Sequence, residues 1–181
     1  MKKYLIISAA AACVLASSVL FAACQPSDYE VISDAVQNAG SASEIVKTIT
    51  VTNDGEEVAS LKEEYTLDGG SYTVVTTERT LNPIGAGEQF SESVTTGTVS
   101  QDEISVGSLP AESALTDIAY TGDLTMTAEV ADLGAVGLTA SDVQGDVTVR
   151  YVVEESQCTE ITMQYSTTNG NNVNVLITFA Y

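Results

Sequence analysis

The chain has 181 residues, with 25 acidic and six basic side chains, a formal net charge of −19 and no histidine. The negative electrostatic field of such a chain repels the phosphates of nucleic acid, so we expect no nucleic-acid partner. The lack of histidine removes the commonest general base and the commonest zinc ligand. The length is enough for one domain with a real hydrophobic core.

The first 23 residues have the pattern of an export signal. Lys2 and Lys3 precede an uncharged, mostly apolar stretch over residues 4–23, as in a secretory signal peptide. A membrane-spanning helix is the alternative, since the stretch approaches the ~20 apolar residues that a span needs. Its several serines and alanines, and the absence of a charged stop-transfer cluster after it, favour the signal peptide.

The residues at the end of this signal specify its type. Phe21-Ala22-Ala23-Cys24 resembles the lipobox of bacterial lipoproteins, with Phe21 where leucine is commoner. The resemblance implies cleavage after Ala23 and lipid attachment at the Cys24 thiol. The mature protein is then expected to be anchored by lipid to the cell membrane, facing outside the cytoplasm, or to the outer membrane if the cell has one.

A short helix is predicted directly after the anchor. Cys24 and a tether over residues 24–27 lead into one domain over residues 28–181. Ser27 and Glu30 have the spacing of a capping box, and Gly40 is a natural helix stop. The predicted helix over residues 28–39 has one apolar stripe, formed by Tyr29, Ile32, Ala35 or Val36, and Ala39.

From Ile45 onward the sequence is typical of antiparallel strands separated by turns. One helical turn is predicted over residues 131–138, and the last three strands are expected to form a meander. The fold class is α+β: an N-terminal helix packed on a curved, mostly antiparallel sheet of about eight strands, like a half-barrel. The strand candidates are residues 45–52, 58–67, 71–81, 90–100, 103–106, 120–130, 147–153, 161–165 and 173–181.

This order of elements on a lipid anchor resembles the LolA/LppX-like lipid-carrier lipoproteins. The resemblance is one of architecture and includes no shared motif. It implies a curved, incompletely closed sheet around an apolar cavity.

Residue patterns for catalysis or metal binding are weak. Neighbouring carboxylates such as Glu63-Glu64 lie on opposite faces of a strand and cannot converge on a substrate. The oxygen-rich segments 53–56 and 142–146 could bind calcium, but ordinary turn chemistry explains both. Cys158 is the one thiol left after Cys13 and Cys24, and alternation places it on the wet face with Glu160. We expect no enzyme activity, no catalytic residue, no metal and no cofactor.

One apolar face in the last third of the chain is the candidate ligand site. It is interpreted either as a lipid-holding groove or as ordinary core under the helix. The first interpretation predicts a carrier of an apolar ligand, and the second an interaction module that binds another envelope protein. The residues of this face are Tyr120, Leu124, Met126, Ile161, Met163, Tyr165, Val175, Ile177 and Phe179.

Overall fold

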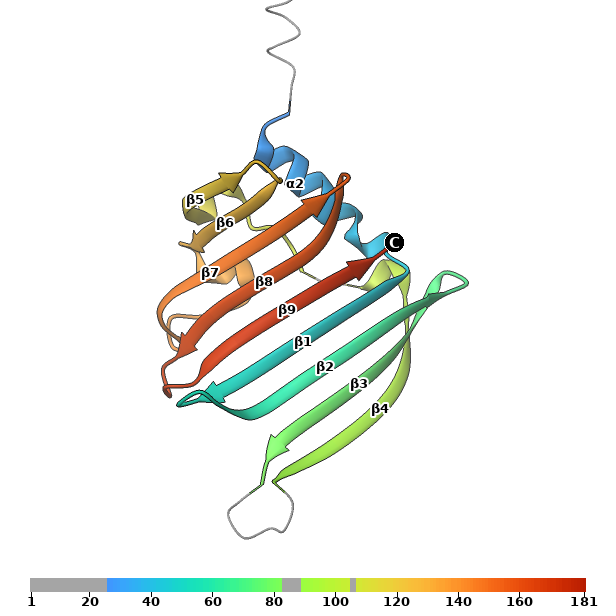
Figure 1. The fold of residues 1–181 in the computed structure, drawn as a ribbon, viewed down its shortest axis with the longest axis vertical. Helices are drawn as coiled ribbons and strands as arrows, with labels where there is room; N and C mark the ends of the chain where they lie inside the picture. Colours follow the sequence, from blue (N-terminus) through green and yellow to red (C-terminus); the bar gives the residue numbers. More distant parts are fainter. Residues whose placement is uncertain (1–25, 83–88, 105–106) are drawn as a thin grey trace, which may run out of the picture.

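The computed structural model describes residues 26–82, 89–104 and 107–181. The predicted signal and lipobox, including Cys24, lie outside the described residues. Nine antiparallel strands form one open sheet in the order β4-β3-β2-β1-β9-β8-β7-β6-β5 (Figure 1). They are β1 Glu44–Asn53, β2 Glu56–Asp68, β3 Ser71–Leu81, β4 Phe90–Ser100, β5 Leu115–Thr121, β6 Thr125–Val130, β7 Val143–Glu154, β8 Gln157–Thr167 and β9 Asn172–Ala180.

The sheet consists of two meanders. Strands β1 to β4 form one and β5 to β9 the other, and pairing of β1 with β9 joins them, with Ile45 opposite Phe179. The connection from β4 to β5, residues 101–114, therefore runs from one edge of the sheet to the other. Nine strands span roughly 40 Å, and 14 residues reach at most about 50 Å. This crossing segment is just long enough to make the crossing, and it begins and ends with a 3₁₀ turn, η2 Gln101–Glu103 and η3 Glu112–Ala114.

Helix α2, Asp28–Gln37, follows the sequence prediction closely. The Ser27 hydroxyl accepts from the Glu30 amide and the Glu30 carboxylate accepts from the Ser27 amide, which confirms the predicted capping box. A 3₁₀ turn, η1 Asn38–Ser41, follows. The expected apolar stripe is buried at Ile32, Ala35 and Val36.

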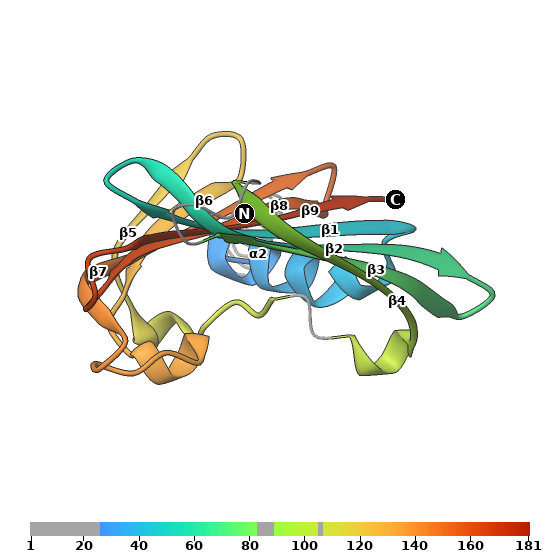
Figure 2. The same cartoon turned by 90° about the horizontal axis from the view of Figure 1, so that it is seen from below.

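The helix and all the 3₁₀ turns lie on one side of the sheet (Figure 2). Helix α2 contacts β7 and β8. The core lies between the helix and the strands β6 to β9, where inward-facing side chains alternate with polar ones, and it also takes in Ile45 of β1 and Tyr72 and Val74 of β3. Strands β2 and β4 have no buried residue among those described. We call β5–β9 the covered half and β1–β4 the open half.

The structure confirms an antiparallel sheet with an N-terminal helix and corrects the details. There are nine strands among the described residues, where about eight were expected. The predicted strand over residues 120–130 is a hairpin, because Gly122 and Leu124, at φ +52°, turn the chain between β5 and β6. The weak strand candidate over 103–106 is also wrong where it is described. Glu103 ends a 3₁₀ turn, η2 Gln101–Glu103, and Ile104 lies outside any strand.

Candidate functional site

An apolar cavity of about 250 Å³ lies on the inner face of the covered half. Strands β7, β8 and β9 form its floor with alternate side chains, which face the same way because a strand has a period of two. The 3₁₀ turn η4, Leu133–Val136, and the crossing segment form its walls. The lining residues are Gly107, Ser108, Ala135, Val136, Gly137, Val149, Tyr151, Ile161, Met163, Val175 and Ile177.

The η4 wall is fixed by local capping. The Asp132 carboxylate accepts from the Gly134 amide at 3.0 Å. Gly137 closes the turn in the left-handed region, at φ +73°, where glycine is favoured. A helical turn in this stretch was predicted from the sequence, and the structure confirms it.

Two tyrosine hydroxyls hold the crossing segment against the rest of the domain. Tyr151 Oη on β7 donates to the Ser108 carbonyl at 2.8 Å, and Tyr29 Oη on α2 donates to the Pro110 carbonyl at 2.6 Å. At Gly107, with φ +108°, a Cβ would lie 3.1 Å from Ile161 Cδ1. The backbone therefore approaches the cavity floor more closely than a larger residue would allow.

The lining carries no Asp, Glu, Lys or Arg among the described residues. Tyr151 is its one group with a resolved pKa shift: burial raises the pKa of the phenol well above its usual value, so it stays neutral at physiological pH. Ser108, exposed at one end, is the other lining residue with a polar side chain. Such a lining offers apolar contact and one neutral hydrogen-bonding end.

The structure brings together four of the nine predicted face residues at this cavity, namely Ile161, Met163, Val175 and Ile177. The other five lie elsewhere. Met126 and Phe179 are buried in the core. The remaining three lie outside the lining: Tyr120 is on the edge strand β5, and Leu124 and Tyr165 pack half-buried against the core.

Sequence reasoning did not assign the other lining residues, which are the β7 part of the floor and the walls. Val149 and Tyr151 were visible as inward positions of an alternating strand. Val136 was visible as an apolar residue of the predicted turn. Gly107 and Ser108 gave no signal, because an irregular segment has no periodicity that relates it to the sheet it crosses.

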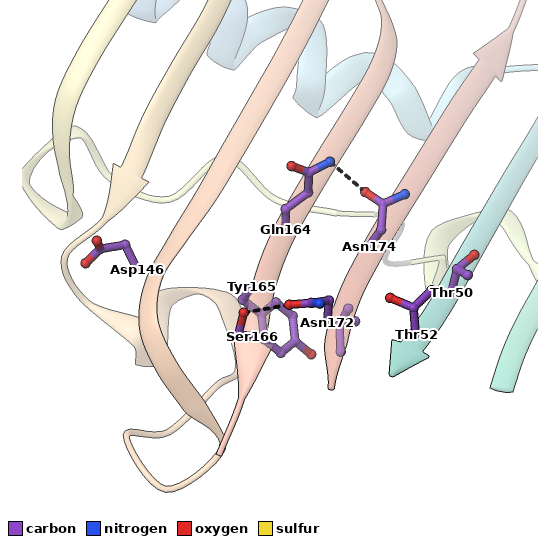
Figure 3. A pocket seen from close by; sticks show the side chains of 9 residues that line it. Thr50, Thr52, Asp146, Gln164, Tyr165, Ser166, Asn172 and Asn174 are labelled. Atoms are coloured by element: carbon purple, nitrogen blue, oxygen red, sulfur yellow. Dashed lines mark hydrogen bonds between the residues drawn. The ribbon is translucent and has the colours of Figure 1, made fainter. Parts of the chain in front are cut away.

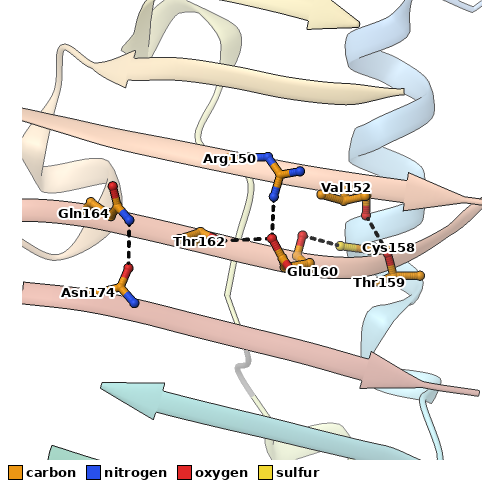
Figure 4. A network of polar contacts seen from close by, with 8 residues as sticks. All are labelled: Arg150, Val152, Cys158, Thr159, Glu160, Thr162, Gln164 and Asn174. Atoms are coloured by element: carbon orange, nitrogen blue, oxygen red, sulfur yellow. Dashed lines mark hydrogen bonds and ion pairs between the residues drawn. The ribbon is translucent and has the colours of Figure 1, made fainter. Parts of the chain in front are cut away.

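Cys158 is buried, which contradicts its predicted place on the wet face. The register explains the error: Val152 pairs with Glu160 but Val153 pairs with Cys158, so Thr159 is an extra residue in a β-bulge (Figure 4). A bulge shifts the alternation by one residue. Burial raises the pKa of the Cys158 thiol to about 11, so it is an inert core group.

A larger hollow, about 550 Å³, lies near the ends of β8 and β9 (Figure 3). Its polar side chains already satisfy one another: Gln164 donates to Asn174 at 3.1 Å and Ser166 to Asn172 at 2.8 Å. It is open, and its composition is that of the wet face of an antiparallel sheet. We therefore take the smaller apolar cavity as the candidate site.

Of the two segments weighed as calcium ligands, 53–56 forms the β1–β2 turn, whereas in 142–146 Asp142 ends a turn and the rest belongs to β7. The Asp142 carboxylate accepts from the Thr139 amide at 2.9 Å and from the Thr139 hydroxyl at 2.6 Å. Asn53 donates its side-chain amide to Asn171 at 2.8 Å. Over residues 26–82, 89–104 and 107–181, no three acidic or cysteine side chains gather as a metal site would require.

No protein-family model matches the chain, and no curated protein matches it either. Among solved structures, a redesigned β-barrel is similar at 13% identity, covering 82% of this chain and 96% of its own, with a TM-score of 0.25. A bifunctional dehydratase-cyclase domain from ambruticin biosynthesis is 10% identical, with coverages of 84% and 80% and a TM-score of 0.21. Likenesses this weak carry no argument about fold or function.

In the part of the chain that the structure describes, no helix has the length and apolar character needed to cross a membrane.

Proposed function

We propose that this protein is a non-catalytic, lipid-anchored extracytoplasmic protein that binds or carries a small apolar ligand. The observation that carries the proposal is the 250 Å³ apolar cavity on the inner face of β7–β9. Ligand sites are typically concave and mostly apolar, with a few polar groups that fix orientation. Here Ser108 and Tyr151 supply those groups beside an otherwise apolar lining.

The anchor rests on the sequence, since Cys24 is the cysteine of the lipobox-like run. Two or more acyl chains on one thiol-linked group are needed for stable anchoring, because each buried methylene contributes only ~0.8 kcal/mol. Cys24→Ser should leave the chain unlipidated. Membrane fractionation and intact mass measure this, and an unchanged mass in the variant would contradict the lipobox interpretation.

The ligand proposal is tested by native mass spectrometry of the protein purified from its own host. Wild-type protein should retain a small molecule as added mass. Ala135→Phe places a ring into the cavity from η4 and should abolish the added mass. Ala131→Phe, at an exposed alanine outside the lining, is the matched control and should keep it. Wild-type protein without added mass, and without any stabilisation by an apolar probe, would contradict the proposal.

A second candidate function is an envelope interaction module, and the edge strand β4 favours it. Its 11 residues pair with β3 in unbroken register and have no described strand on the other side. It contains no Lys or Pro, the usual protection of an edge, and Val94 is 58% exposed. A photo-crosslinking residue at position 94 should form adducts with one envelope protein in cells. The same residue at Asp123, in the exposed β5–β6 turn, should not.

A further inference from the structure

We infer that the cavity selects an uncharged ligand of on the order of ten non-hydrogen atoms and discriminates against fatty-acid or phospholipid anions. This inference rests on the proposed function, because it specifies the ligand class of the same site. Three observations support it: where the cations lie, how large the cavity is, and which polar groups line it.

The cations of the described residues are all engaged by carboxylates, including Lys47, which lies on β1 directly opposite the lining residue Ile177. Lys47 Nζ lies 3.0 Å from Glu63 Oε2, Lys62 Nζ lies 2.8 Å from Glu64 Oε1, and Arg79 contacts Glu57 and Glu92. Arg150 is paired with Glu160 on the outer face (Figure 4). None of these residues lines the cavity.

An anionic headgroup in the cavity would therefore meet no unpaired cation, because Lys47, the cation opposite Ile177, is already neutralised by Glu63. Placing an unpaired carboxylate in apolar surroundings costs at least several kcal/mol, more than a few methylene contacts return. The remaining carboxylates add to the penalty, since a chain of net charge −19 repels an approaching anion. A neutral ligand incurs neither the desolvation penalty nor the repulsion by the carboxylates.

The volume limits the ligand to a small molecule. An apolar cavity of about 150 Å³ holds benzene, so a cavity of about 250 Å³ holds on the order of ten non-hydrogen atoms. Close packing of Gly107 against Ile161 and Ile177 fixes one wall. A two-chain lipid is far larger than this space.

The polar groups fit one neutral substituent. Tyr151 already donates its proton to the Ser108 carbonyl, so its oxygen is left as an acceptor. The Ser108 hydroxyl, at the exposed end, can both donate and accept. A ligand with a hydroxyl or carbonyl at one end and a hydrocarbon body matches this arrangement.

Equilibrium dialysis of the full-length protein held in amphipol tests the inference with two matched probes. 1-Nonanol and sodium nonanoate have nearly equal size, and at pH 8 nonanoate is ionised, because carboxyl groups have pKa values near 4. We expect about one equivalent of nonanol bound, with nonanoate at least tenfold weaker. Empty amphipol corrects for partition of each probe.

The outcomes separate the inference from the function on which it rests. Nonanoate binding as tightly as nonanol, in competition with it, would overturn the inference and leave the ligand-binding function in place. Binding of neither probe above the empty-amphipol level would overturn the proposed function itself. Preference for nonanol that is lost in Ala135→Phe and kept in Ala131→Phe supports both. The wild-type comparison of the two probes needs no variant, so it stands even if Ala135→Phe folds poorly.

Discussion

The two halves of the sheet share one hydrogen-bonded ladder but differ in what covers their inner face. In the covered half, β6 to β9 point apolar side chains such as Met126 and Ile177 into a core under α2 and the crossing segment. In the open half, the inner face carries a half-buried ion pair, Lys47–Glu63, and the exposed carboxylate Glu78 on the adjacent strand.

The difference shows that much of the ladder in the open half lies beyond the core, which takes only Ile45, Tyr72 and Val74 from these four strands as buried members. Backbone hydrogen bonds continue in register through β2, β3 and β4, although β2 and β4 contribute no described buried residue. Native-state stability is uneven in such a structure, and elements with few buried contacts open at lower free energy. The following predictions test how large that difference is.

The largest expected effect is the contrast between two apolar truncations. Met126 is fully buried in the covered half, whereas Leu61 is partly exposed on the inner face of β2. Met126→Ala should lower the free energy of unfolding by ~2–5 kcal/mol, through lost transfer energy and the cavity left behind. Leu61→Ala should cost under ~1 kcal/mol, because its side chain is partly solvated already. Urea melts measure both, and equal losses would show that Leu61 of β2 is as well packed as the core.

A smaller effect is expected from polar substitution at the bulge. Cys158 is buried in the covered half, so Cys158→Ser places a hydroxyl among apolar groups and should cost ~1–3 kcal/mol. Val94→Ser, on the exposed edge of the open half, should cost under ~0.5 kcal/mol, as surface substitutions usually do. If Cys158→Ser melts like the wild type, the bulge at Thr159 does not turn this side chain inward.

The bulge at Thr159 is one of the features that the sequence could not predict. Periodicity predicted the alternating strands of the covered half and the capping box predicted the helix start, because both depend on neighbouring residues. The bulges at Thr159 and Asp117 depend on partner strands, and nothing in the local pattern marks them. The hairpin at Gly122 was visible as a glycine, yet the alternation on both sides of it was interpreted as one strand.

The candidate site could likewise be predicted only in part. The four floor residues that the sequence assigned, Ile161, Met163, Val175 and Ile177, come from β8 and β9, whose alternation was clear. The sequence left both groove and core open for this face and favoured core, because a period of two says only which way side chains point. Whether a cavity remains depends on how η4 and the crossing segment pack, and that is set by contacts such as Tyr151 to Ser108.

Alkaline pH should lower the free energy of unfolding, because a partly or fully buried tyrosine in each half of the sheet must ionise. Burial, with a contribution from the nearby Glu63, raises the pKa of Tyr65 in the open half to about 12, and burial raises that of Tyr151 in the covered half further. A folded-state pKa raised above the unfolded value of about 10 gives stability that is complete below pH 10. This contribution to stability is lost as the pH rises from 10 through 12.

Absorbance of tyrosinate against pH, recorded with thermal melts, checks this prediction. Tyr65→Phe should remove one ionisation step near pH 12 and leave a protein whose melting temperature falls less between pH 10 and 12. A wild-type titration in which every tyrosine ionises near pH 10 without unfolding would contradict it.

The smallest expected effect comes from comparing two carboxylates. Glu129 in the covered half is repelled by like charges, and Glu92 in the open half is attracted to a cation. Like charge from Asp146, then desolvation and Asp117, raises the pKa of Glu129 on β6 in the covered half. Its ionised form therefore opposes folding at neutral pH, and Glu129→Gln should raise the melting temperature slightly. Glu92, on β4 in the open half, lies 3.6 Å from Arg79 Nε, so Glu92→Gln should be neutral or slightly destabilising.

The dependence of the Glu129→Gln stabilisation on pH and on salt identifies its cause. A carboxyl group with a raised folded-state pKa binds its proton more tightly in the folded protein, so the gain from Glu129→Gln should shrink as the pH falls toward that pKa. It should also shrink in 1 M salt, where the Debye length is only about 3 Å. A gain that persists in high salt and at acid pH would reflect packing or strand propensity at this position, and the repulsion between Glu129 and Asp146 would then contribute nothing measurable.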